Sequence, residues 1–357
     1  MIRVQMAGKT DLGLHRQINE DSFGIVGGKN LAIVCDGMGG HAAGEVASQC
    51  AVETLARLHH DFRIPAEASD AFEISPDFSE ESRFLVTSVR IANTRIHRLS
   101  SQDSSVAGMG TTIVVARVHG SRISICHVGD SRAYRIREGV LNQLTQDHSL
   151  VGELVATNQL TPEEAEAHPN RNVITRALGV RERVKVDLRE ENVIPGDVFL
   201  LCTDGLTGCV PDTEILRVVT DTGDDLEAIG DGLIAAANAG GGDDNITCAL
   251  IAIKGDDPGN LEDRKLETFS FPEETDGEYQ AQLVVGDILD EQAGDQGDSN
   301  QVDSDDDTQK VDTTESKGHS GSFVLTSLVV IVIIILFAYA LDIGGAREVI
   351  SGMLGLQ

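Results

Sequence analysis

This sequence is poor in positive charge. Its 357 residues include 58 Asp or Glu but only 28 Lys or Arg, which gives a formal net charge of −30 at pH 7. A nucleic acid backbone would be repelled by the general field of such a protein. We therefore expect no nucleic acid partner, and a site that binds phosphate must carry its own local positive charge.

Paired cysteines are absent as well. The six cysteines lie singly, mostly within apolar stretches, and no C-x-x-C pair occurs. They are Cys35, Cys50, Cys126, Cys202, Cys209 and Cys248. This pattern is typical of buried, reduced residues in a cytosolic domain. The first residues, MIRVQMAGKTDLG, contain no apolar run behind their charges, so we expect no secretory signal peptide and a cytoplasmic domain after them.

In the first 254 residues, apolar runs alternate with glycine-containing turns and helical patterns. This alternation predicts a mixed α/β domain. Short connections between the central runs favour antiparallel hairpins and disfavour a Rossmann-type parallel sheet. Amphipathic helices are predicted for residues 44–60 and 82–99, and a capping box at Thr161 predicts a third helix. The predicted strands are Leu31–Cys35, Thr111–Val118, Arg122–Val128, Ala133–Arg137 and Val198–Thr203.

Beyond residue 254 the composition changes twice. Residues 255–320 contain twenty Asp or Glu against four Lys or Arg, which predicts a disordered, self-repelling linker. Residues 323–341, FVLTSLVVIVIIILFAYAL, carry no charge and would span ~28 Å as a helix, close to the hydrocarbon thickness of a bilayer. We therefore predict a single transmembrane helix, a short tail over residues 342–357, and a cytoplasmic domain attached to the cell membrane.

Four segments place an aspartate beside glycine or at the end of an apolar run, where its carboxylate can reach a shared pocket. They are Cys35-Asp36-Gly37-Met38-Gly39-Gly40-His41, Gly129-Asp130-Ser131-Arg132, Thr203-Asp204-Gly205 and Asp243-Asp244-Asn245. Each segment alone is more often a turn than a ligand. Together they supply carboxylate oxygens without a matching His or Cys cluster, a ligand set that suits Mg²⁺ or Mn²⁺ rather than Zn²⁺.

A guanidinium group stands beside further acids near the N-terminus, in the segment RQINED over residues 16–21. Arginine binds phosphate through two parallel hydrogen bonds, so Arg16 would supply the local positive charge that the overall composition lacks. The alternative, for Arg16 taken alone, is a surface salt bridge to Glu20 four residues later.

The motifs follow one another as in the metal-dependent type 2C protein phosphatases, which this chain resembles over about residues 7–253. They are Arg16-x-x-Asn19-Glu20-Asp21, Asp36-Gly37-Met38-Gly39-Gly40-His41, Gly110-Thr111-Thr112, Val128-Gly129-Asp130-Ser131-Arg132, Thr203-Asp204-Gly205 and Asp244-Asn245. Met38 and His41 resemble the bacterial branch. The resemblance implies an α+β fold, a four-layer α-β-β-α sandwich of two antiparallel sheets flanked by helices, to which the transmembrane helix is added.

The resemblance also implies a mechanism. A hydroxide bridging two Mn²⁺ or Mg²⁺ ions would attack the phosphorus, with a possible third ion at Asp130, and Arg16 would hold the phosphate for in-line attack. The implied metal ligands are Asp21, Asp36, Gly37, Asp130, Asp204 and Asp244. Asp36 would bridge the two ions, and Asp21 would act through water.

The general acid stays open at this point. Eukaryotic relatives place a histidine two residues after the bridging aspartate, where this chain has Met38. The candidates are His41 and a metal-bound water. The alternative for His41 is a residue at a helix start that only makes a local hydrogen bond.

We predict a protein-serine/threonine phosphatase, a phosphoric monoester hydrolase that acts on phosphorylated proteins and opposes a Ser/Thr protein kinase at the membrane. Residues 150–171 are the predicted flap for substrate choice, and residues 60–81 a surface loop. The alternative is a catalytically silent scaffold of the same fold that binds phosphoproteins. The complete set of acidic ligands favours the enzyme.

Overall fold

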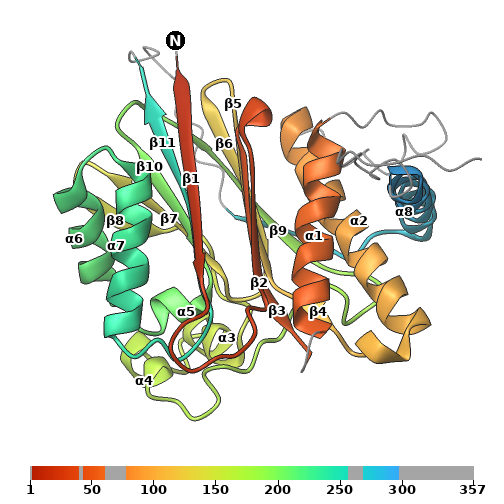
Figure 1. Cartoon of the computed structure of the whole chain (residues 1–357), viewed down its shortest axis with the longest axis horizontal. Helices are drawn as coiled ribbons and strands as arrows, with labels where there is room; N and C mark the ends of the chain where they lie inside the picture. Colours follow the sequence, from red (N-terminus) through yellow and green to blue (C-terminus); the bar gives the residue numbers. More distant parts are fainter. Residues whose placement is uncertain (1, 40–42, 61–77, 256–267, 297–357) are drawn as a thin grey trace, which may run out of the picture. The chain divides into compact units, whose positions relative to one another are not determined.

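The structure is a computed structural model and describes residues 2–39, 43–60, 78–255 and 268–296. Two antiparallel β-sheets lie face to face there, and helices cover their outer faces (Figure 1). The predicted sandwich of two antiparallel sheets flanked by helices is confirmed.

The first sheet has five strands in the order β1-β11-β10-β7-β8. The strands are β1 (Arg3–Asp11), β7 (Arg132–Arg137), β8 (Val140–Gln143), β10 (Val198–Cys202) and β11 (Ile246–Lys254). The helices on its outer side are α5 (Asp204–Thr207), α6 (Asp212–Thr222) and α7 (Leu226–Ala239). Leu200 of the sheet and Leu233 of α7 belong to one buried apolar cluster, which attaches these helices.

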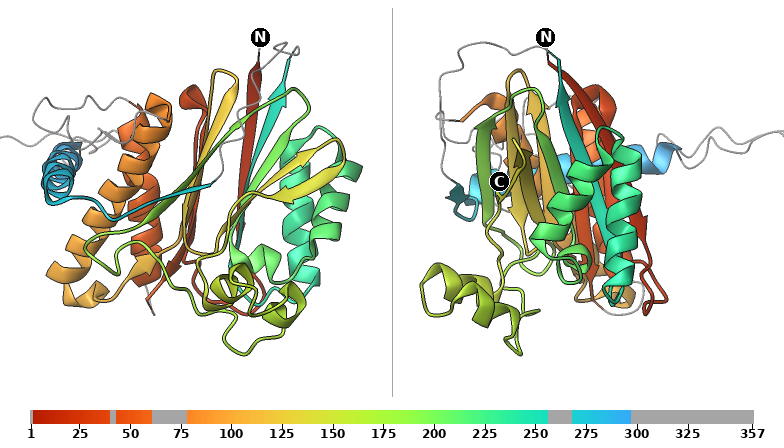
Figure 2. Two further views of the ribbon diagram at one scale, coloured as in Figure 1. Left: turned by 180° about the vertical axis from the view of Figure 1, so that it is seen from behind. Right: turned by 90° about the vertical axis from the view of Figure 1, so that its left-hand side faces the viewer.

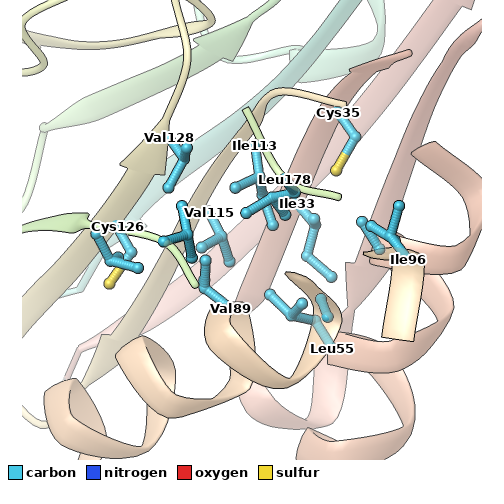
Figure 3. Packing of buried hydrophobic residues seen from close by; sticks show 14 of the residues in the cluster. Ile33, Cys35, Leu55, Val89, Ile96, Ile113, Val115, Cys126, Val128 and Leu178 are labelled. Carbon is cyan, nitrogen blue, oxygen red and sulfur yellow. The ribbon is translucent and has the colours of Figure 1, made fainter. Parts of the chain in front are cut away.

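The second sheet has the strand order β12-β9-β6-β5-β3-β2, with β4 beside β3. The strands are β2 (Asp21–Val26), β3 (Leu31–Met38), β4 (Gly110–Thr111), β5 (Ile113–His119), β6 (Arg122–Val128), β9 (Val186–Asn192) and β12 (Phe269–Phe271). Its outer helices are α1 (Ala43–His60) and α2 (Glu80–Gln102), and the short 3₁₀ turns are η1 (Gly27–Lys29) and η3 (Ser104–Val106). Figure 3 shows Ile33 and Val115 of the sheet packed with Leu55 and Val89 of the helices.

The central strands are buried on both faces. In β3, Leu31 and Ile33 pack against the helices, whereas Ala32 and Val34 face the other sheet. A strand covered on both sides is apolar at every position rather than at alternate ones. This is why the continuous apolar runs predicted these strands. They occur with the predicted or slightly shifted ends, except that the predicted strand Thr111–Val118 is divided at Thr112 into β4 and β5.

The helix predictions also hold, with two side chains misplaced. Thr161 Oγ1 accepts a hydrogen bond from Glu164 N (3.2 Å) and Glu164 Oε2 accepts one from Thr161 N (2.9 Å), which is the predicted capping box of α4 (Pro162–Glu166). It follows α3 (Leu150–Ala156) in the flap. Val46 and Leu99 are among the apolar positions on which the two amphipathic helices were predicted to face the sheet, but each is 38% exposed. In α1 the buried stripe runs through positions 43, 47, 50 and 54, and Val46 falls beside it.

Part of the stretch that composition predicts to be a disordered linker is ordered. β12 pairs with the edge of β9, and α8 (Asp276–Gln296) packs along α2 (Figure 2). The linker prediction is therefore wrong for residues 268–296, called the C-terminal extension below. Ala281, Val285 and Leu289 recur every four residues and form a buried apolar stripe along α8, a pattern that the acidic average conceals.

Arginines of α2 provide the partners that the acids of the C-terminal extension need. Arg95 pairs with Asp290 and Arg98 pairs with Asp287. A third arginine, Arg90, is only 3% exposed and its Nη2 donates to the Pro272 carbonyl at 2.6 Å. The composition gives the number of acidic residues in this stretch, but it does not show which arginines they pair with after folding.

Within these same ranges, no helix is both long and apolar enough to cross a bilayer. The predicted transmembrane helix over residues 323–341 and the tail over 342–357 lie outside the described residues.

Candidate metal centre

Aspartates from both sheets meet at one end of the sandwich. Asp21 begins β2 and is paired across the strands with Asp36 near the end of β3. Asp130 follows β6, Asp204 follows β10, and Asp244 lies two residues before the start of β11. Because neighbouring strands are antiparallel, the end of one strand lies beside the start of the next, and all these aspartates lie at the same end of the sandwich. The structure thus brings together the five predicted carboxylate ligands.

The backbone of Asp36 is held by the two threonines of the Gly110-Thr111-Thr112 motif. Thr112 N donates to the Asp36 carbonyl at 2.9 Å, and Asp36 N donates to Thr112 Oγ1 at 3.1 Å. Thr111 Oγ1 donates to the same Asp36 carbonyl at 2.9 Å. Thr112 Oγ1 also lies 2.7 Å from Ser131 Oγ, so the Asp36 strand end and the Asp130 turn are fixed to each other.

Two glycines are required where backbones approach closely. A Cβ on Gly37 would lie 2.1 Å from the Gly44 carbonyl oxygen, because α1 begins against this strand. A Cβ on Gly205 would lie 1.9 Å from the Asn245 carbonyl oxygen. These contacts allow Asp36, Asp204 and Asp244 to share one site, and they explain Gly37 and Gly205 without a special backbone conformation.

Asn245 holds the loop that carries Arg16. It belongs to the Asp244-Asn245 motif, but the sequence predicted no role for it. Its Nδ2 donates to the carbonyls of Leu12 and Ile18, both at 3.0 Å, and its Oδ1 accepts from Glu20 N at 2.8 Å. The only sequence signal was its position beside Asp244, because its partners lie more than two hundred residues away.

Arg16 contacts the aspartate cluster. Its Nη2 donates to Asp244 Oδ2 at 2.6 Å, and its side chain is 46% exposed. Arg16 therefore forms its ion pair with Asp244 and not, as the alternative had it, with Glu20. A half-exposed positive charge therefore lies beside the carboxylates.

The carboxylates are an unfavourable group without counter-ions. Burial raises the pKa of Asp36 well above its ordinary value, and the charges on Asp21 and Asp204 add to this shift. Burial likewise raises the pKa of Asp21 to about 7 and that of Asp130 to about 7. Oxygen ligands crowded in this way fit divalent cations such as Mg²⁺ or Mn²⁺, which would offset the repulsion.

In metal-free protein, the free energy of unfolding should fall as the pH rises from about 4 to about 7. Asp21 has a folded-state pKa of about 7 against an ordinary 3.8, so the folded state binds more protons across this window. Thermal unfolding in EDTA at several pH values measures the effect. The slope should be smaller in Asp21→Asn, and a slope unchanged by that substitution would contradict the prediction.

Three other residues named from sequence have different outcomes. His41 lies outside the described residues, so its candidacy as general acid stays a prediction. Met38 ends β3, as the last residue of that strand. Asp243 points away from the cluster toward solvent, with a side chain 82% exposed and 3.7 Å from His15 Nε2.

Comparison with known proteins agrees with this arrangement. Residues 15–231 match the family described as Protein phosphatase 2C. The serine/threonine phosphatase stp of Listeria monocytogenes is 39% identical over 249 residues, which cover 68% of this chain and 93% of that protein.

Solved structures give the same relationship. The crystal structure of the Mycobacterium tuberculosis serine/threonine phosphatase PstP/Ppp has a TM-score of 0.63 at 36% identity, over 71% of this chain and 100% of that one. The catalytic domain of PstP in complex with two manganese ions has a TM-score of 0.60 at 34% identity, over 71% and 100%. The chain therefore belongs to the protein phosphatase 2C family, in its bacterial branch, and the predicted class of enzyme, a protein serine/threonine phosphatase, is confirmed.

Proposed function

We propose that this protein hydrolyses phosphoserine and phosphothreonine in proteins at the aspartate cluster, with two Mn²⁺ or Mg²⁺ ions and a possible third. The observation that carries the proposal is the grouping of five carboxylates beside one half-exposed guanidinium. The ligands would be Asp36, the Gly37 carbonyl, Asp204 and Asp244, with Asp21 acting through water and Asp130 on the side of the third ion. Bound divalent cations supply positive charge to the phosphoryl oxygens and lower the pKa of the attacking water.

Arg16 is proposed to bind the phosphate group. Its guanidinium is held near the carboxylates by one contact, to Asp244, and enough of the side chain is exposed for it to turn toward a substrate. A planar guanidinium can hold two phosphate oxygens at once and so fix the direction from which the phosphorus is attacked. The proton for the leaving serine or threonine oxygen would come from His41 or from water.

The cellular setting is proposed from sequence. A phosphatase of phosphorylated serine and threonine would reverse the action of a Ser/Thr protein kinase. Residues 323–341 would attach it to the cell membrane with the catalytic domain in the cytoplasm, because nineteen uncharged residues match the length of a bilayer-spanning helix.

The test is phosphate release from a phosphothreonine peptide by residues 1–296, measured with Mn²⁺, with Mg²⁺ and with EDTA. This fragment keeps the C-terminal extension, which packs on α2. We expect turnover with metal and a loss of at least about a hundredfold in EDTA, because the cations supply several kcal/mol of the charge stabilisation. Metal binding without turnover on several phosphopeptides would instead favour the silent scaffold.

A further inference from the structure

A second cluster of buried polar side chains lies near the aspartates but is separate from them. It consists of His127 on β6, Asp187 on β9 and His148 just before α3, with one nitrogen or oxygen of each within 4.8 Å of the others. Arg176 Nη1 lies 3.0 Å from Asp187 Oδ1 and 3.1 Å from His148 Nε2. Because a guanidinium already supplies positive charge there, the cluster is a hydrogen-bonded network rather than a second metal site.

His148 holds both polar backbone groups of Gly129, the residue before Asp130. Gly129 N donates to His148 Nδ1 at 3.1 Å, and His148 N donates to the Gly129 carbonyl at 2.9 Å. Gly129 has a φ of +113°, and a Cβ there would lie 2.6 Å from Thr112. The turn that presents Asp130 is therefore tight, and its position depends on the His148 ring on one side and on Thr112 on the other.

Asp187 decides how that ring is protonated. An Nδ1 atom that accepts from the Gly129 amide carries no proton, so the proton of the neutral ring is on Nε2. Nε2 lies 3.3 Å from Asp187 Oδ2, the acceptor within its reach. Arg176 Nη1 is as close, at 3.1 Å, but a guanidinium can only donate, so with Nε2 protonated Arg176 is held by Asp187 Oδ1 and not by the ring. If the proton were on Nδ1 instead, the ring N–H would face the Gly129 N–H, and two donors cannot form a hydrogen bond. The Asp187 carboxylate thus selects the tautomer that binds the turn.

The C-terminal extension reaches this carboxylate. Asp187 is paired across the sheet with His127 of β6 on one side and with Ser270 of β12 on the other. Ser270 Oγ donates to Asp187 Oδ1 at 2.6 Å. The extension lies beyond residues 15–231, which match the family.

We propose that Ser270, Asp187 and His148 form a positioning relay that sets the Gly129–Asp130 turn, so that the C-terminal extension adjusts how the candidate metal centre holds the ion nearest Asp130. The role in metal binding rests on the proposed function. None of the three residues touches the reacting atoms; each acts through the next, and the last acts through the backbone of the turn.

Ser270→Ala is the decisive variant, because Ser270 lies on the exposed edge strand and its loss leaves the sandwich core intact. Two readouts are used with the 1–296 protein: the Gly129 amide signal by nuclear magnetic resonance in EDTA, and Mn²⁺ affinity by titration calorimetry. Outer partners of metal ligands are generally worth about 10- to 100-fold in affinity. Asp187→Asn should weaken the weakest Mn²⁺ site about tenfold, and Ser270→Ala should shift the same amide signal and weaken the same site to a smaller extent.

Matched variants separate a relay from general loosening. Ser270→Thr keeps the hydroxyl and should restore both readouts, whereas Thr268→Ala, an exposed position two residues earlier, should change neither. An unshifted Gly129 amide and unchanged Mn²⁺ affinity in Ser270→Ala would overturn the proposal, even if its melting temperature fell. Absence of Mn²⁺ binding in the unaltered protein would reject the proposed function instead, and the amide shift would still decide whether the relay exists.

Discussion

Asp36→Asn is expected to reduce phosphate release about a thousandfold and, in metal-free protein, to raise the free energy of unfolding. On the proposed function, the loss of activity follows because Asp36 is the central carboxylate of the cluster, and the cations that it would help to hold would supply several kcal/mol of charge stabilisation. The gain in stability follows because burial and the neighbouring charge on Asp21 disfavour the ionised form of Asp36. Asparagine has the same shape without the charge.

Two measurements check this prediction: phosphate release with Mn²⁺, and urea unfolding in EDTA. Asp243→Asn is the matched control, because Asp243 is an aspartate next to Asp244 whose side chain is 82% exposed. It should leave both measurements unchanged. Metal-dependent turnover that survives in Asp36→Asn would show that the metal ligands are assigned to the wrong residues.

Leu289→Ala is expected to lower the free energy of unfolding by about 2–4 kcal/mol, as large-to-small changes in a core do. Leu289 is 1% exposed and belongs to a buried cluster with Leu58 of α1 and Ile91 of α2. Removing its side chain leaves a cavity between α8 and the two helices that cover the second sheet. Urea unfolding of the 1–296 protein gives the value directly.

Val284→Ala on the same helix is the control for that experiment. Val284 is 43% exposed, so its truncation should change the free energy of unfolding by less than about 0.5 kcal/mol. Equal effects of the two substitutions would mean that α8 does not dock on α2 in solution.

The parts of the fold that sequence predicted are those whose apolar pattern is continuous or strictly periodic. β6 occurs with the predicted bounds, because its residues are buried on both faces. β9 was not predicted, since its sequence VDLREEN reads as polar. Its Glu190 and Glu191 are buried all the same, paired at 2.7 Å with Arg122 and Arg135 from other strands. Such pairing is set by tertiary contacts and leaves no local pattern.

The candidate site divides in the same way. Its carboxylates were predictable because each stands in a short motif, and the motifs follow one another in the order of the family that the chain resembles. The residues that hold those motifs in place were not, because their partners are distant in sequence: Asn245 binds the loop of Arg16, and His148 binds the turn of Asp130. The carboxylates could therefore be found from local sequence motifs, whereas the residues that hold these motifs in place could be identified only from the folded structure.

The ion pair between Arg16 and Asp244 links two binding events on the proposed function. A cation bound at Asp244 would compete with the guanidinium for the charge of the same carboxylate, and a guanidinium released from Asp244 would be free to bind an anion. Cation and phosphate then favour each other through the arginine alone, and thermodynamic reciprocity requires the coupling to be equal in both directions. The centre would therefore bind the cation and the phosphate more tightly together than it binds either one alone. Free phosphate would then bind only weakly when no cation is present.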